Sequence, residues 1–322
     1  GALGCVFLGF TSSWLWFLLV FVIAKSAYSL SLVVYDSMLT DITDKDRMDE
    51  VSSHGYAWGY IGSCIPFIIS LLLVLFYDKI GISMELAMGG AFLLTAIWWV
   101  GMAFPLIAAY QQKNFTPVTK SPVSSGLKRL ARIFSELKEK KKILFFLIAF
   151  FFFIDGVYTI IDMATAYGTA LGLDTTGLLL ALLLTQIVAF PAALIFGRLS
   201  RKAPASRLIL ICIGAYFCIS LYGIILSKQY QFWILAVCVG IFQGAIQSLS
   251  RSYFAQIIPE DRSGEYFGIY DICGKGASFM GTMLVSLVSQ ISGSVNLGRR
   301  TFPDVPHRLS VFHKNRQNLI KL

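Results

Sequence analysis

The sequence predicts an all-α membrane protein with about eight whole spanning helices and part of a ninth. Hydrophobic residues make up 56 % of the 322 positions and charged residues only 14 %, against roughly 25 % charged in an ordinary soluble domain. Runs of about 18 or more apolar residues are typical of helices that cross a bilayer. Long apolar runs with few or no charges occur at residues 65–76, 143–154, 177–196 and 208–226.

Eight segments are long enough to span. They lie at residues 13–39, 54–77, 85–110, 143–171, 175–196, 206–227, 230–258 and 266–292. Residues 1–11 are interpreted as the end of one more helix, because the chain begins inside an apolar stretch and without an initiator Met. We therefore expect a fragment that lacks the first helices and the last one.

The basic residues predict the orientation, because Lys and Arg are enriched in cytoplasmic loops. The connection at residues 111–142 carries nine of them against two glutamates, so we expect it to be cytoplasmic. Counting helices from there places residues 41–53, 198–207 and 259–265 on the same side. The net charge of +9 is thus interpreted as orientation charge, and no nucleic-acid partner is expected.

An internal repeat is visible when the sequence is shifted by 215 positions, which aligns residues 36–63 with residues 251–278. Both copies contain the pattern D-R-x-x-E, beginning at Asp46 and at Asp261. Both also occupy connections on the predicted cytoplasmic side, as a parallel duplication of a helical bundle requires.

The repeat and the basic connection predict four regions. Residues 1–110 form an incomplete first helical bundle and residues 143–298 an incomplete second one. Residues 111–142 link them and include an amphipathic helix at 127–142, which we expect to lie at the membrane surface. Residues 299–322 are an atypical basic tail without a spanning run, although the chain should be outside at that point.

Four stretches resemble one family of transporters. They read V-V-Y-D-S-M-L-T-D-I at 33–42, V-S-S-H-G-Y-A-W-G-Y-I-G at 51–62, F-I-D-G-V-Y-T-I-I-D-M-A at 153–164 and Q-S-L-S-R-S-Y-F-A-Q-I-I-P-E at 247–260. These are similar to the vacuole-effluxer-like branch of the major facilitator superfamily. The resemblance implies a double six-helix bundle, incomplete here, and secondary transport of a small polar solute, with amino acids as the implied class.

Charged side chains at mid-bilayer cost several kcal/mol and are therefore candidates for function. At about 1.5 Å per residue, Asp155 and Lys25 each lie roughly 18 Å along their predicted helices, near the midplane. Tyr158 and Thr159 follow Asp155 on the same helix face, so we expect this group to hold solute or carry a proton. The alternative for Asp155 is a structural hydrogen bond or ion pair, and for Lys25 it is snorkelling toward a headgroup.

Polar residues on the last two predicted helices form a second group. Gln243, Gln247 and Arg251 recur every four residues and share one helix face, where the glutamines face a cavity or join helices. Asp36 and Arg251 occupy equivalent repeat positions, so we expect an ion pair that gates the cytoplasmic side. Asp271 and Lys275 are candidates for the same gate, or pair only with each other.

The sequence lacks the residues that metal binding, a disulfide framework or ATP-driven transport would require. The six cysteines show no metal or disulfide spacing, the three histidines are scattered, and there is no Walker A sequence. We expect no metal, no cofactor and no enzymatic activity. The expected partners are a small-molecule solute and the lipid bilayer, in a monomer of the bacterial inner membrane. A non-transporting scaffold or a degenerate remnant is the alternative, and the sequence leaves substrate, coupling ion and direction open.

Overall fold

The computed structural model describes residues 1–11, 13–114 and 122–292, and within these ranges every regular element is a helix. The first half runs from α1 to α6. Its elements are α1 (Ala2–Leu8), α2 (Trp14–Ser37), α3 (Leu39–Ile42), η1 (Lys45–Arg47), α4 (Met48–Leu75), α5 (Tyr77–Ile80) and α6 (Met84–Ala109).

The second half follows the linker helix α7 (Pro122–Glu136). Its elements are α8 (Lys141–Ala170), α9 (Thr175–Leu199), α10 (Ala205–Ile225), α11 (Gln229–Ile257), η2 (Glu260–Arg262) and α12 (Ser263–Ser292). The predicted tail at 299–322 lies outside the described residues.

Seven helical segments of the described chain are long and apolar enough to cross a membrane, and they match the first seven predicted spans in order. The eighth predicted span is also a helix, α12, whose 30 residues are about 45 Å long. It is less apolar because its first half carries Glu265, Asp271 and Lys275. The predicted all-α fold is confirmed, and the chain is an integral multi-pass membrane protein.

Two predicted boundaries were wrong. The span expected at 54–77 begins six residues earlier, at Met48, where Asp49 and Glu50 in the first turn favour a helix N-terminus. The amphipathic helix expected at 127–142 is α7, which ends at Glu136 and is followed by a turn before α8. Ile133 of α7 and Leu137, the residue that follows the helix, are buried in the core of the second half, so part of the apolar face of α7 contacts protein.

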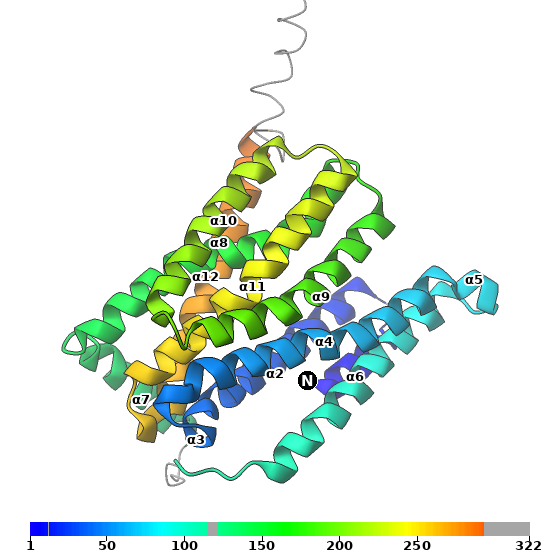
Figure 1. The fold of residues 1–322 in the computed structure, drawn as a ribbon. Coiled ribbons are helices and arrows are strands. Elements are labelled where there is room, and N and C mark those ends of the chain that lie inside the picture. Colours follow the sequence, from blue (N-terminus) through cyan, green and yellow to red (C-terminus); the bar gives the residue numbers. More distant parts are fainter. Residues whose placement is uncertain (12, 115–121, 293–322) are drawn as a thin grey trace, which may run out of the picture.

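The two halves lie side by side, with α4 packed against α9 and α11 and with α2 against α12 (Figure 1). Small residues allow this close approach. A Cβ atom at Gly244 of α11 would lie 3.0 Å from the Cβ of Ala193 in α9 and 3.1 Å from the ring of Tyr60 in α4. The halves diverge from the end where α7 lies toward the end where α5 lies (Figure 1). We call the α7 end the linker side.

Candidate functional site

A cavity of about 590 Å³ lies between the two halves. Both halves supply polar or charged side chains to its wall. The first half contributes Lys25, Tyr28, Tyr35, Asp36, Tyr56, Tyr60 and Ser63, and the second half contributes Tyr158, Asp162, Gln186, Gln243, Gln247, Arg251, Tyr270, Asp271, Lys275 and Ser278.

Arg251 forms the end of the cavity that faces the linker side. Its Nη1 lies 3.0 Å from Oδ1 of Asp36, its Nε donates to Oγ of Ser52 at 2.9 Å, and its Nη2 donates to the carbonyl oxygen of Ser52 at 3.0 Å. The guanidinium also lies over the rings of Tyr35 and Tyr56, at 5.4 and 4.6 Å from their centroids. The predicted pairing of Asp36 with Arg251 is therefore present, and the side chain of Arg251 is only 4 % exposed.

Next to this pair, toward the linker side, a layer of hydrogen bonds joins α4 to α11. Oγ of Ser52 donates to the carbonyl oxygen of Ser248 at 2.7 Å, and the hydroxyls of Ser53 and Ser248 lie 3.2 Å apart. One turn further toward the linker side, Asp49 accepts hydrogen bonds from Ser252 at 2.5 Å and from Gln256 at 2.9 Å. These contacts close the linker side of the cavity.

Two ion pairs extend the closure to the surface. Lys45 pairs with Glu260 at 3.2 Å, and Glu50 pairs with Arg201 at 2.5 Å. Among the contacts between α4 and the second half, the hydrogen bond farthest from the linker side is donated by the hydroxyl of Tyr60 to Oε1 of Gln247, at 2.8 Å. Beyond Tyr60, the described part of α4 forms no hydrogen bond or ion pair with the second half. The closure is thus confined to the linker side.

The cavity brings together four of the six residues predicted to contact solute or a proton: Lys25, Tyr158, Gln243 and Gln247. The Lys25 ammonium lies 5.5 Å from the centroid of the Tyr28 ring, and no ion pair to it is found among the described residues. Of the predicted gate residues, Asp271 and Lys275 also line the cavity, where they pair with each other within α12 at 3.4 Å.

Asp155 and Thr159 do not line the cavity. Their side chains lie 3.5 Å apart on α8 and face Gly281 of α12, where an added Cβ atom would collide with both. The two helices therefore meet at this point, and α12 covers the carboxylate that the sequence placed nearest the midplane.

Sequence reasoning missed other wall residues. Asp162, two turns beyond Asp155, lines the cavity and accepts a hydrogen bond from Ser278 at 2.7 Å. On α4, Tyr56, Tyr60 and Ser63 share one face at spacings of four and three residues. That spacing was the available signal for a polar helix face.

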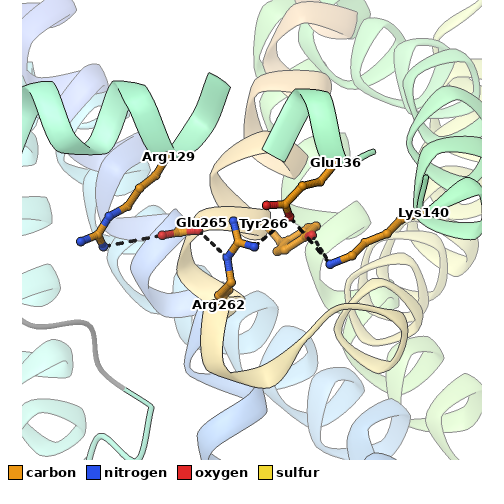
Figure 2. A network of polar contacts seen from close by, with 6 residues as sticks. All are labelled: Arg129, Glu136, Lys140, Arg262, Glu265 and Tyr266. Carbon is orange, nitrogen blue, oxygen red and sulfur yellow. Dashed lines mark hydrogen bonds and ion pairs between the residues drawn. The ribbon is translucent and has the colours of Figure 1, made fainter. Parts of the chain in front are cut away.

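The linker helix is fastened to the second half by charged side chains (Figure 2). Arg262 donates to Glu265 at 2.9 Å and to Glu136 at 2.8 Å, while Arg129 pairs with Glu265 at 3.6 Å. The ammonium of Lys140 donates to the hydroxyl of Tyr266 at 2.8 Å. The second copy of the D-R-x-x-E pattern thus binds α7, whereas Glu50 of the first copy pairs across the halves.

The other end of the linker is held by the first half. Asp41, which is 4 % exposed, accepts hydrogen bonds from the hydroxyl of Tyr110, from the backbone N–H of Asn114 at 3.2 Å and from its side-chain amide at 2.7 Å. Burial, together with the hydrogen bond to Asp41 and its negative charge, raises the pKa of Tyr110 to about 12.

Comparison with known proteins agrees with this architecture. The family described as vacuole effluxer Atg22 like matches residues 1–299. An uncharacterized MFS-type transporter of Bacillus subtilis, YxiO, is 38 % identical over 282 residues, which are 87 % of this chain and 66 % of that protein.

Fungal proteins are more distant relatives. Autophagy-related protein 22-2 of Aspergillus clavatus is 25 % identical over 76 % of this chain and 44 % of its own length. Autophagy-related protein 22 of Candida glabrata is 27 % identical over 79 % of this chain and 52 % of its own length. The chain therefore spans just under two thirds of the bacterial relative and about half of the fungal ones.

Proposed function

Because the chain belongs to the Atg22-like vacuole effluxer family, we propose that it is a secondary transporter that moves a small polar solute across the membrane by alternating access. The observation that carries this proposal is the polar cavity between the two halves, closed on the linker side by contacts that run between the halves. In an alternating-access cycle such contacts break when the cavity opens to the other side.

The charges of the wall support a zwitterionic solute, with amino acids as the proposed class. Arg251 and Lys275 each have a carboxylate partner inside the cavity. Lys25 has no carboxylate partner in the described chain, and Asp162 has only the hydroxyl of Ser278. Lys25 is thus available for a solute carboxylate and Asp162 for a solute ammonium, since opposite charges attract strongly in a partly dry site.

Gating is proposed for the ion pair between Asp36 and Arg251. Both side chains are largely withdrawn from solvent, with 18 % and 4 % exposed, so separating them costs far more than separating a surface pair. Opening the linker side then requires compensation by water or by other side chains. Asp271 and Lys275 line the same end of the cavity and are proposed to exchange partners with this pair during the cycle.

Proton coupling is proposed for Asp155, although it does not line the cavity. It lies between α8 and α12 next to Thr159. A change in its charge would alter the contact between these helices, one of which carries Asp162 and the other Asp271 and Lys275. Protonation can thus act on the cavity through the packing of two wall helices.

The test is uptake of radiolabelled amino acids into liposomes that contain the purified protein, with and without an imposed pH gradient. We expect saturable uptake that unlabelled solute competes away and that empty liposomes lack. Folded protein that binds no amino acid and shows no uptake under either condition would favour the scaffold alternative. We also propose a monomer in the bacterial inner membrane, with the linker side facing the cytoplasm.

A further inference from the structure

A second, basic cavity of about 460 Å³ lies on the linker side, apart from the polar cavity between the halves. Its wall includes Lys45 of the first half and three consecutive lysines, Lys140 to Lys142, that immediately precede and begin α8. The end of α11 and the following turn complete it. Four lysines line this cavity against a single acidic residue, Glu139.

Two of these four ammonium groups already have partners. Lys140 is held by Tyr266 and Glu136 at 2.8 and 3.9 Å (Figure 2), and Lys45 pairs with Glu260 at 3.2 Å. Lys141 and Lys142 are exposed and form no ion pair with any described residue. The ammonium of Lys142 only approaches the ring of Tyr253, at 6.0 Å from its centroid.

The backbone adds to the positive potential at this place. Lys141 is the first residue of α8, whose first turn holds no acidic side chain and whose N-cap residue, Lys140, does not cap the helix through its side chain. The free N–H groups of such a turn favour an anion. Two uncompensated lysines and an uncapped helix start therefore border one cavity, which suits a phosphate-bearing ligand.

The helix continues from this turn into the membrane. Phe145, Ile148 and Phe152 follow Lys141 by 4, 7 and 11 residues, which places them on the same helix face, and their side chains are 65, 47 and 72 % exposed. A ligand with an anionic headgroup at Lys141 and Lys142 and apolar chains along this face would fit both the basic cavity and the exposed apolar face of α8. A free phosphate ion would fit only the basic cavity.

We propose that this cavity binds the headgroup of an anionic phospholipid from the linker-side leaflet. Lys45 belongs to the first half and Lys141 and Lys142 to the second, so a headgroup that contacts all three adds a link between the halves. The lipid then favours the conformation in which the linker side is closed. This consequence for transport depends on the proposed function, whereas lipid binding itself does not.

The test is thermal unfolding of the purified protein in a neutral detergent, titrated with short-chain phosphatidylglycerol, with phosphatidylcholine of equal chain length, or with inorganic phosphate. A ligand that binds only the folded state raises the unfolding temperature. We expect phosphatidylglycerol to do so at the lowest concentration. Each lysine near an anionic lipid contributes about 1 kcal/mol, so K141Q/K142Q should weaken the apparent affinity by about 30-fold.

Matched variants make the result specific. K128Q/K138Q removes two lysines that are exposed and lie outside the cavity, and it should respond to phosphatidylglycerol like the unaltered protein. K141R/K142R keeps both charges and should also respond. The proposal fails if the unaltered protein does not distinguish phosphatidylglycerol from phosphatidylcholine, if phosphate alone stabilises as well as the lipid, or if K128Q/K138Q loses the response as K141Q/K142Q does.

Discussion

Arg251 and Asp36 are 215 residues apart in the chain, and the guanidinium of one lies 3.0 Å from the carboxylate of the other. The same shift of 215 aligns the two halves of the internal repeat. Equivalent residues of two repeats related by a pseudo-two-fold axis can touch only near that axis. The ion pair therefore lies near this axis, and it was predictable from the repeat.

Replacing Asp36 by Asn should open the linker side. It leaves the buried guanidinium of Arg251 without its counter-charge, which costs about 3–5 kcal/mol in comparable buried pairs. Spin labels at Asp46 and Asp261, exposed residues in the equivalent short helices η1 and η2, would report the change by pulsed EPR. In the measured distribution, the short distance between the two labels should become less populated and a longer distance more populated.

The matched control for that experiment is Asp78→Asn. It removes a carboxylate charge that is exposed on α5, away from the linker side, and should leave the distance distribution nearly unchanged. Equal shifts for the two variants would show that the pair between the halves has no special part in closure.

Replacing Gly281 by Ala should destabilise the contact between α8 and α12. The added Cβ atom collides with the side chains of Asp155 and Thr159, and overpacking of this kind costs about 1–3 kcal/mol. Gly276→Ala serves as the control, because its Cβ atom would meet only the ring of Phe151 at 3.7 Å. Thermal unfolding should separate the two variants, and indistinguishable curves would place Asp155 outside this contact.

The hydrogen bond by which Tyr110 anchors the linker to Asp41 should be lost at strongly alkaline pH. The pKa of Tyr110 rises from 10.0 to about 12 on folding, so the neutral phenol stabilises the folded state. This contribution is complete below pH 10 and is lost as the pH rises toward 12. Tyr110→Phe should cost about 1–2 kcal/mol at neutral pH, measured by denaturant unfolding. A difference that does not shrink above pH 10 would contradict this assignment.

Asp155→Asn should uncouple transport from protons. The variant keeps the shape of the side chain and removes its titration, so uptake driven by a pH gradient should fall to the level of exchange, while exchange of preloaded solute continues. Both fluxes are measured in proteoliposomes. Unchanged proton-driven uptake would reduce Asp155 to a structural residue between α8 and α12.

The spans and their order were predictable because the bilayer dictates long apolar runs. The rotation of each helix about its own axis is set by packing against its neighbours, and it was not predictable from the sequence. Asp155 and Asp162 lie seven residues apart on nearly the same face of α8, yet Gly281 lets α12 cover Asp155 and leaves Asp162 at the cavity. Likewise, the sequence does not show that Glu50 pairs with Arg201 while Glu265 pairs with the linker.

The most direct test of the central claim is a reversible crosslink across the linker side. The hydroxyl oxygens of Ser53 and Ser248 lie 3.2 Å apart between α4 and α11, within reach of a disulfide if both become cysteine. In a background without the six native cysteines, oxidation should stop solute uptake in proteoliposomes and reduction should restore it. Each single cysteine variant should be insensitive to oxidation. Full uptake by the crosslinked protein would contradict alternating access through this cavity.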